Sequence, residues 1–210
     1  MPLYKTIHIS ADVVLHIWNI TESEEELQKN VMLTDLCDKR VKGMKSELHR
    51  KGFLSIRHLM HLEGYKDRDL YYDDLGKPHL HDGNHISISH SFEFTGIIIS
   101  RKQRVGIDIE KQREKIIKIA HKFTTLPIQD GKWEREVLVR KLTKLWGAKE
   151  SLYKISAIQG LSFLQNIFIE TEFDHKKWFA GEINVDEVYS EFKISHLEFE
   201  GFTCVYALKE

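Results

Sequence analysis

Three extended segments joined by short connections place the strongest constraint on the fold of this chain. They read ISISHS, FTGIIIS and VGIDIE and lie between residues 86 and 110. Their alternating pattern and their β-branched residues predict three β-strands. The turn RKQR leads from the second segment into the third. Because this connection is too short for a crossover, we expect an antiparallel hairpin there.

Further helices and strands are predicted in the first half. Residues 4–18 predict one or two strands, and a helix is expected to begin at Thr21, a natural N-cap. Residues 39–65 are predicted to be mostly helical, because apolar residues recur at helical spacing, and Gly64 is expected to end that helix. Residues 71–85 contain turn-forming residues and predict a loop.

The second half of the chain repeats this mixture. A basic helix is predicted from Arg113 to Lys122 and a long helix from Trp133 to Lys154. Beyond Gly160, short strands are predicted in the segments NIFIE, KWFAGEI, EFKISHLEF and FTCVYAL. A Phe-Thr pair precedes an apolar strand in each half, in FTGIII and in FTCVYAL. This repetition hints at two similar halves.

Composition indicates a soluble globular protein of one domain or of two small halves. The chain has 210 residues, of which 41% are hydrophobic and 30% charged. Its 31 basic and 32 acidic residues nearly cancel, so no overall field favours nucleic acid. Cys37 and Cys204 form no CxxC spacing and indicate a reducing compartment. No signal peptide or membrane span is visible. We therefore expect a cytoplasmic monomer without a membrane or nucleic-acid partner.

The strand predicted at VGIDIE carries two carboxylates, Asp108 and Glu110. Alternate side chains of a strand point to the same face, so these two should stand side by side, with Ile107 and Ile109 on the opposite face. Adjacent like charges repel unless something positive lies between them. The alternative is a half-buried strand whose polar face is in water.

A third carboxylate, Glu150, lies in the long helix, within LTKLWGAKESLYKI. Lys154 is one turn further on, so the two can pair at i,i+4. Lys149 falls inside the predicted apolar face. In the alternative interpretation, Lys149 extends to water and Glu150 with Lys154 is an ordinary surface pair. Glu150 itself is predicted at the edge of the apolar face formed by Leu138, Leu142, Leu145, Trp146 and Tyr153.

Together, the three carboxylates suggest a metal site. If Asp108, Glu110 and Glu150 met, they would repel one another strongly. They fit a hard divalent cation that takes its remaining oxygens from water and a phosphate ligand. Lys149 and Lys154 could then meet the charge of that phosphate.

Four motifs, GKPHL, ISISHS, VGIDIE and WGAKESLYK, resemble in their order and spacing the 4'-phosphopantetheinyl transferases. The chain length resembles the longer, single-chain, surfactin-synthetase-activating type. The resemblance implies an α+β fold, a pseudo-dimer of two similar α/β halves, each a small antiparallel sheet packed with a long helix. It implies coenzyme A nucleotide contacts in an N-terminal half, residues 1–104, and a magnesium site with the catalytic helix in a C-terminal half, residues 105–210.

The resemblance also implies a reaction. The 4'-phosphopantetheine group of coenzyme A would move to a serine of an apo acyl or peptidyl carrier protein in the presence of Mg²⁺, with release of adenosine 3',5'-bisphosphate. Asp108, Glu110 and Glu150 would hold the magnesium, and Glu150 with Lys154 would be catalytic. The implied coenzyme A contacts are Arg50, Lys77, Pro78, Ser89, His90, Lys149 and Lys154, with Arg57 as the alternative to Arg50.

Other functions stay open. His79, His81 and His85 could suggest zinc. Ser89 beside His90 could suggest a serine hydrolase, but the chain has no G-x-S-x-G elbow. A magnesium-dependent phosphohydrolase would use the same three carboxylates, and a non-catalytic module could bind a carrier protein or a nucleotide. The chain departs from the resembled family at KFTTLP, where aromatics are common, and at QGLS, where a lysine is common.

Overall fold

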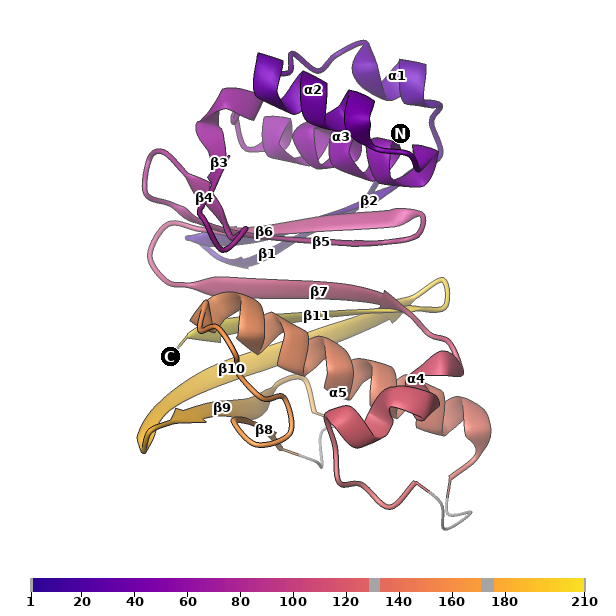
Figure 1. Cartoon of the computed structure of the whole chain (residues 1–210), viewed down its shortest axis with the longest axis vertical. Helices are drawn as coiled ribbons and strands as arrows, with labels where there is room; N and C mark the ends of the chain where they lie inside the picture. Colours follow the sequence, from indigo (N-terminus) through magenta and orange to yellow (C-terminus); the bar gives the residue numbers. More distant parts are fainter. Residues whose placement is uncertain (1, 129–132, 171–175, 210) are drawn as a thin grey trace. The chain divides into compact units, whose positions relative to one another are not determined.

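The structure is a computed structural model that describes residues 2–128, 133–170 and 176–209 (Figure 1). The chain divides into two compact units, Met1–Gln103 and Arg104–Glu210. Each unit combines an antiparallel sheet with one long helix, which confirms the predicted α+β class and is consistent with a pseudo-dimer of two halves. No helix in these described ranges is long and apolar enough to cross a membrane.

The first unit is built on a four-stranded antiparallel sheet with the order β1-β2-β6-β5. The predicted hairpin between FTGIIIS and VGIDIE is wrong, because β6 already pairs with β2 on one edge and with β5 on the other. The hairpin forms between β5 and β6 instead. The strands are β1 (Leu3–Ser10), β2 (Val13–Asn19), β5 (His85–Ser91) and β6 (Phe94–Ser100).

The long helix α3 (Glu47–Leu62) packs against β2 and β6 of this sheet. Its N-cap is Ser46, whose hydroxyl accepts a hydrogen bond from the His49 amide. Gly64 follows the helix with a φ of +82°, a conformation that glycine adopts at little cost, so the predicted helix end is confirmed. The helix buries the apolar residues that predicted it, Phe53, Ile56, Leu59 and Met60.

Two local predictions in this unit are wrong, and one is confirmed with a difference in detail. The N-cap of the first helix is Ser23 rather than Thr21, because Ser23 forms a capping box with Glu26. Residues 39–65 are mostly helical, as predicted, but they contain parts of two helices, because Ser46 starts a new one. The loop predicted at residues 71–85 contains most of a small hairpin, β3 with β4. These shorter elements are α1 (Glu24–Gln28), α2 (Asp35–Gly43), η1 (Asp67–Asp69), β3 (Leu70–Tyr72) and β4 (Pro78–Leu80).

The second unit has a five-stranded antiparallel sheet with the order β7-β11-β10-β9-β8. Strands form in all four segments predicted after Gly160. The predicted basic helix is short and ends in a 3-10 turn, and the predicted long helix is α5. The elements are β7 (Val105–Lys111), α4 (Lys115–Ile119), η2 (Ala120–Lys122), α5 (Arg135–Ser156), β8 (Ile167–Ile169), β9 (Phe179–Val185), β10 (Val188–Phe199) and β11 (Phe202–Lys209).

Helix α5 lies very close to β7 and β11, because glycines occupy the points of contact. A Cβ atom at Gly106 would lie only 2.1 Å from the carbonyl oxygen of Ser151. One at Gly147 would lie 2.9 Å from Cγ2 of Val205. The Ser151 hydroxyl also donates a hydrogen bond of 3.0 Å to the Val205 carbonyl. Together, these contacts hold the turn of α5 around residue 150 close to β7 and β11.

The apolar face of α5 is largely as predicted, with one difference. Tyr153 lies at the rim of the face rather than inside it: its ring packs on Phe163 and the residue is 36% exposed. Towards its end the helix buries Leu152 and Ile155 instead. Leu138, Leu142 and Leu145 are buried and Trp146 is partly buried against the same core.

Candidate active site

Strand β7 directs Asp108 towards α5. An added Cβ at Gly147 of α5 would lie 3.6 Å from Oδ2 of Asp108, so this carboxylate faces the helix. Asp108 is buried and Glu110, two residues on, is half-buried. The alternation of the strand places both on one face, while Ile107 and Ile109 are buried on the other.

Lys154 brings a positive charge to this strand. Its ammonium donates hydrogen bonds to Oδ1 of Asp108, at 2.8 Å, and to the carbonyl oxygen of Ile107, at 2.9 Å. The predicted i,i+4 pairing with Glu150 overlooked this longer-range contact. The ammonium therefore supplies part of the positive charge that the two carboxylates of β7 require.

The pKa of Glu150 depends on its burial and on the charges of Asp108 and Lys154. Burial, followed by the charge of Asp108, raises the pKa of Glu150 to about 7; Glu110 raises it further and Lys154 opposes the shift. The carboxyl therefore exchanges protons near neutral pH, which suits a general base or acid. The helix edge and the strand do bring the three predicted carboxylates into one electrostatic environment.

Asp108, Glu110 and Glu150 do not lie close enough together to form a complete metal site. No group of three or more His, Cys, Asp or Glu side chains in the part of the chain that the structure describes is close enough to hold a metal ion. The donor set nevertheless fits a hard divalent cation, because it consists of carboxylate oxygens. Lys154 currently bonds to one of these oxygens, so a cation would have to share or take over that contact.

The histidines of the zinc alternative are arranged differently. Tyr71 of β3 stacks on the ring of His79, with centroids 5.2 Å apart, and on the ring of His81, at 4.7 Å. His79 also bonds to Asp73 at 2.9 Å. The two imidazoles thus take part in a ring stack on the β3–β4 hairpin.

Lys149 differs from both interpretations of the sequence. It is 5% exposed, so it does not extend to water. Its ammonium donates hydrogen bonds to the carbonyl oxygens of Phe163 and Ile167, the latter at 2.7 Å. Burial lowers the pKa of Lys149 to about 8. The ammonium is held inside the unit by protein carbonyls, a position that does not present it to a phosphate.

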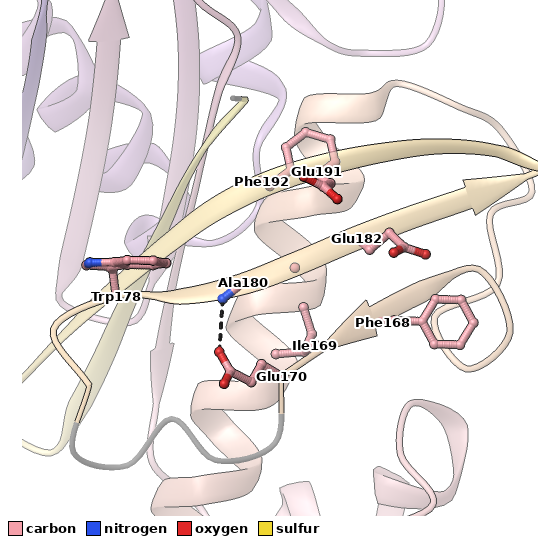
Figure 2. A pocket seen from close by; sticks show the side chains of 9 residues that line it. Phe168, Ile169, Glu170, Trp178, Ala180, Glu182, Glu191 and Phe192 are labelled. Atoms are coloured by element: carbon pink, nitrogen blue, oxygen red, sulfur yellow. Dashed lines mark hydrogen bonds between the residues drawn. The ribbon is translucent and has the colours of Figure 1, made fainter.

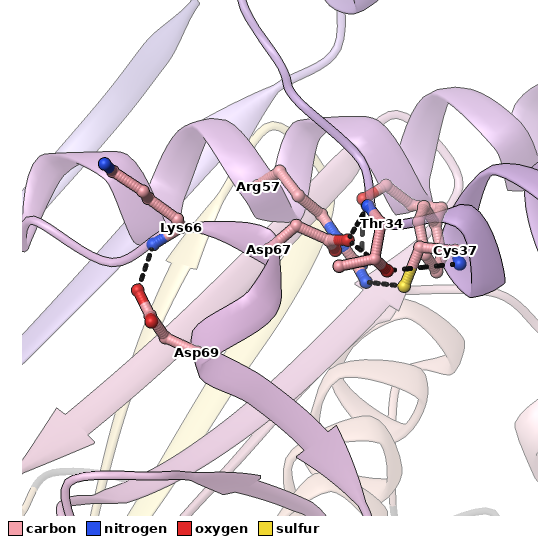
Figure 3. Close-up of polar contacts among 7 residues, drawn as sticks. Thr34, Cys37, Arg57, Lys66, Asp67 and Asp69 are labelled. Carbon is pink, nitrogen blue, oxygen red and sulfur yellow. Dashed lines mark hydrogen bonds and ion pairs between the residues drawn. The ribbon is translucent and has the colours of Figure 1, made fainter.

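Arg57 is also buried, in a polar network that Figure 3 shows. It is 1% exposed, donates to Asp67 at 2.8 Å, and lies over the Phe53 ring. Asp67 in turn accepts hydrogen bonds from the amide and hydroxyl of Thr34, the N-cap of α2. Arg57 also donates to the Cys37 sulfur at 3.5 Å. The alternative assignment of Arg57 to a phosphate is therefore wrong: the guanidinium joins α2, α3 and η1.

Arg50, the other arginine candidate, is partly exposed but engaged. Its Nε donates to both carboxylate oxygens of Glu24 at 2.9 Å, and its Nη1 donates to the Met44 carbonyl at 2.8 Å. A phosphate would have to compete with Glu24 for this guanidinium.

Two further candidates lie on β5. Ser89 is buried at 6% exposure, and His90 packs its ring so closely on Gly52 of α3 that an added Cβ there would lie 2.8 Å away. The Nε2 of His90 is hydrogen-bonded to the Phe92 carbonyl at 2.9 Å. Burial lowers the pKa of His90, although that hydrogen bond opposes the shift. Adjacent strand residues point to opposite faces, which disfavours a Ser89–His90 hydrolase pair.

The last pair, Lys77 and Pro78, forms the end of the β3–β4 hairpin loop. The Lys77 amide donates to Oδ1 of Asp73 at 2.9 Å, and Pro78 is paired opposite Tyr72. Because β4 contacts β5, this loop and the His90 strand are neighbours within the first unit.

A basic hollow beside Glu110 was missed by the sequence reasoning. It is lined by Glu110, Lys111, Arg113, Lys115, Ile116, Ile119, Thr143 and Trp146. The signal was present in EKQREK, where three cations follow Glu110 within five positions. The hollow places positive charge next to a carboxylate of the candidate site.

A second hollow lies on the sheet of the second unit, and none of the predicted site residues lines it (Figure 2). Half-exposed Phe168 and Trp178 border it. Glu182 of β9 and Glu191 of β10 stand directly opposite each other in it. Like charges opposite one another destabilise a sheet slightly.

Comparison with protein families gives a match to the second unit. No curated protein matches the chain. Residues 104–207 match the model of a family described as the 4'-phosphopantetheinyl transferase superfamily. The matched range contains Asp108, Glu110, Glu150 and Lys154, and the match supports a transferase. Residues 104–207 therefore form a domain of the 4'-phosphopantetheinyl transferase superfamily.

Proposed function

We propose that this protein transfers the 4'-phosphopantetheine group of coenzyme A to a serine of an apo acyl or peptidyl carrier protein, releasing adenosine 3',5'-bisphosphate. The observation that carries the proposal is the charged cluster of Asp108, Glu150 and Lys154, where α5 lies against β7. This cluster falls within the family match. The proposal includes a monomer that acts in the cytoplasm.

Asp108, Glu110 and Glu150 are the residues that would hold Mg²⁺. When bound, the ion supplies charge neutralisation for the pyrophosphate of coenzyme A and for the leaving phosphate. The basic hollow beside Glu110 and the ammonium of Lys154 support this placement, because both offer positive charge to the same phosphates.

Two residues of the chain carry out the other steps of the proposed reaction, proton acceptance and charge stabilisation. Glu150 is the group that would accept the proton of the carrier serine, directly or through a water; one carboxylate cannot serve fully as ligand and base at once, so a water takes the proton while Glu150 holds the ion. Lys154 stabilises negative charge on the transferring group. Phosphoryl transfer depends mainly on such positioning and charge neutralisation.

We assign the nucleotide end of coenzyme A to the first unit, through Arg50, Lys77, Pro78, Ser89 and His90. Two of these contacts have a cost in the present structure: Arg50 must share its guanidinium with Glu24, and His90 must share its ring nitrogen with the Phe92 carbonyl. Lys149 is left out of this set, because its ammonium is already bonded to two carbonyls.

The test is intact-mass analysis of carrier proteins. The protein is incubated with coenzyme A, Mg²⁺ and a panel of apo carriers, and the wild type is compared with Asp108→Ala. We expect one carrier to gain the mass of phosphopantetheine with the wild type only, while circular dichroism shows both proteins folded. Full transfer by a folded Asp108→Ala variant would refute the assignment of the metal site. No mass gain on any carrier would leave the phosphohydrolase and the non-catalytic module as the alternatives.

A further inference from the structure

A hydroxyl, an imidazole and a carboxylate are joined by hydrogen bonds in the first unit, among residues that the proposed transfer does not use. Oγ1 of Thr6 lies 2.8 Å from Nδ1 of His16. Nε2 of the same imidazole lies 2.7 Å from Oε1 of Glu63. A hydroxyl within hydrogen-bond reach of a base, which a third group orients, is the arrangement that activates a nucleophile in many enzymes. We call these three residues the Thr6 triad.

Three elements bring the triad together. Thr6 of β1 stands directly opposite His16 of β2, and Glu63 is the C-cap of α3. His16 shares a face of β2 with Val14 and Trp18, which belong to the core cluster that α3 helps to form. The imidazole therefore lies on the side of the sheet that α3 covers. Because β1 stands at the end of the strand order, the hydroxyl lies at the border of that sheet.

Glu63 fixes the tautomer of His16. An ionised carboxylate only accepts hydrogen bonds, so Nε2 of the imidazole carries the proton that it donates to Glu63. In the neutral ring, Nδ1 is then the acceptor for the hydroxyl proton of Thr6. The donors and acceptors therefore run in one direction, from the hydroxyl through the ring to the carboxylate, as general base catalysis requires.

Exposure differs among the three side chains in a way that suits a reaction at Thr6. His16 is 3% exposed, so the surrounding protein holds the imidazole in place and shields it from water. Thr6 is only half-buried, so solvent reaches this residue. A small molecule can therefore approach the hydroxyl while the base behind it stays covered.

We propose that Thr6 is a nucleophile for small activated carboxylic esters, with His16 as its general base and Glu63 as the positioning residue of the imidazole. Oγ1 of Thr6 forms a bond to the carbonyl carbon of the ester, and its proton passes to Nδ1 of His16 and from there to solvent. The bond between that carbon and the leaving oxygen breaks, and the leaving group departs with the electron pair. The acyl group stays on Thr6 as an ester. The proposed phosphopantetheinyl transfer uses other residues, so the two proposals stand or fall separately.

The probe is p-nitrophenyl acetate, whose leaving group departs readily. Peptide mapping by mass spectrometry measures the rate at which each threonine gains an acetyl group, and absorbance measures the release of p-nitrophenolate. Exposed Thr21 of the same unit is the internal control. We expect Thr6 to react at least about a hundredfold faster than Thr21, because a positioned general base contributes on the order of 10²–10⁴-fold. Thr6→Val should abolish the reaction at this position and Thr6→Ser should restore it.

Two further variants separate the roles of the base and of the positioning residue. His16→Gln should slow the acetylation of Thr6 by about 10²–10⁴-fold, since it removes the general base. Glu63→Gln should slow it less and should change the nitrogen chemical shifts of the His16 ring, because an amide no longer dictates which ring nitrogen carries the proton. Unchanged shifts in Glu63→Gln would overturn the positioning role of Glu63.

The wild type alone can refute the reaction at Thr6, whether or not a variant folds. Acetylation of Thr6 no faster than that of Thr21, together with equal release of p-nitrophenolate by the wild type and Thr6→Val, would overturn the inference. The triad would then be a structural link between β1, β2 and the end of α3. Thr6→Val suits this comparison, because it removes the hydroxyl but keeps the shape of a half-buried side chain.

Discussion

At the scale of single residues, Lys154 determines the charge balance of the candidate site. It bonds to Asp108 and to a backbone carbonyl of β7, and its charge lowers the pKa of Glu150 against burial and two neighbouring carboxylates. The sequence predicted that these side chains act together, because the alternation of VGIDIE and the spacing of KESLYK are local. The Lys154–Asp108 contact and the burial of Lys149 and Arg57 were not predictable, since each depends on elements distant in sequence.

Lys154→Met is predicted to slow transfer and to move the acidic limb of the pH–rate profile to higher pH. The reason is that Lys154 lowers the pKa of Glu150, so removing its charge raises that pKa and the proposed base is protonated over a wider range. Methionine keeps the helix propensity and the alkyl stem. The profile of kcat against pH is the measurement, and an unmoved acidic limb would contradict this coupling.

Asp67 gives a prediction about stability and pH in the first unit. Burial alone would raise its pKa, but the Thr34 amide and the Arg57 guanidinium outweigh burial and hold the pKa below its usual 3.8. The stabilisation is therefore present above pH 3.8 and is lost as the pH falls through the lower folded value.

Asp67→Asn should lose about 3–5 kcal/mol of stability at pH 7, as when one partner of a buried ion pair is removed. It should also show a smaller loss of stability on acidification than the wild type. Urea unfolding at several pH values is the measurement, with the exposed Asp74→Asn as control. Equal stability of the Asp67 and Asp74 variants at pH 7 would show that the network of Figure 3 contributes little.

At the scale of elements, the close packing of α5 on β7 holds the site together. The sequence indicated most elements correctly, because β-branched alternation and helical spacing are local signals. It failed where pairing depends on distant parts of the chain: β6 is a central strand with both edges occupied, so β7 does not pair with it and pairs with β11 in the other sheet. The short β3–β4 hairpin was hidden among turn residues, since its strands have only three residues each.

Gly106→Ala is predicted to destabilise the second unit by about 1–3 kcal/mol, as for other overpacked sites. The added methyl would collide with the Ser151 carbonyl and force α5 away from β7. Transfer activity should fall with it, because Glu150 and Lys154 move with the helix. Gly43→Ala is the matched control, since no atom lies within 4 Å of its added Cβ. Thermal unfolding measures the stability of both variants. Equal melting temperatures would show that the close approach of α5 to Gly106 does not limit the size of the residue there.

The sheet hollow of Figure 2 yields a second prediction for an element. Glu191→Lys replaces a pair of opposed carboxylates across β9 and β10 with an ion pair to Glu182. It should stabilise the unit by about 0.2–1 kcal/mol, the usual size of a cross-strand pair. Urea unfolding measures the change. A loss of stability would mean that Glu191 has a favourable role in the sheet.

At the scale of the whole molecule, the chain consists of two units of similar make-up, and the matched family range lies in the second. The proposed catalytic residues all belong to that unit, whereas the proposed nucleotide contacts belong to the first. The proposed reaction therefore uses residues of both units: we propose that the first binds the nucleotide of coenzyme A and that the second transfers its arm to the carrier serine.

The release of adenosine 3',5'-bisphosphate distinguishes transfer to a carrier serine from hydrolysis of coenzyme A. It is measured by chromatography after incubating the protein with coenzyme A and Mg²⁺, with and without apo carrier, and with a carrier whose acceptor serine is replaced by alanine. We predict release only with the intact apo carrier, in equal amount to the phosphopantetheine gained by its serine. Rapid release without any carrier would contradict transfer and identify the protein as a phosphohydrolase.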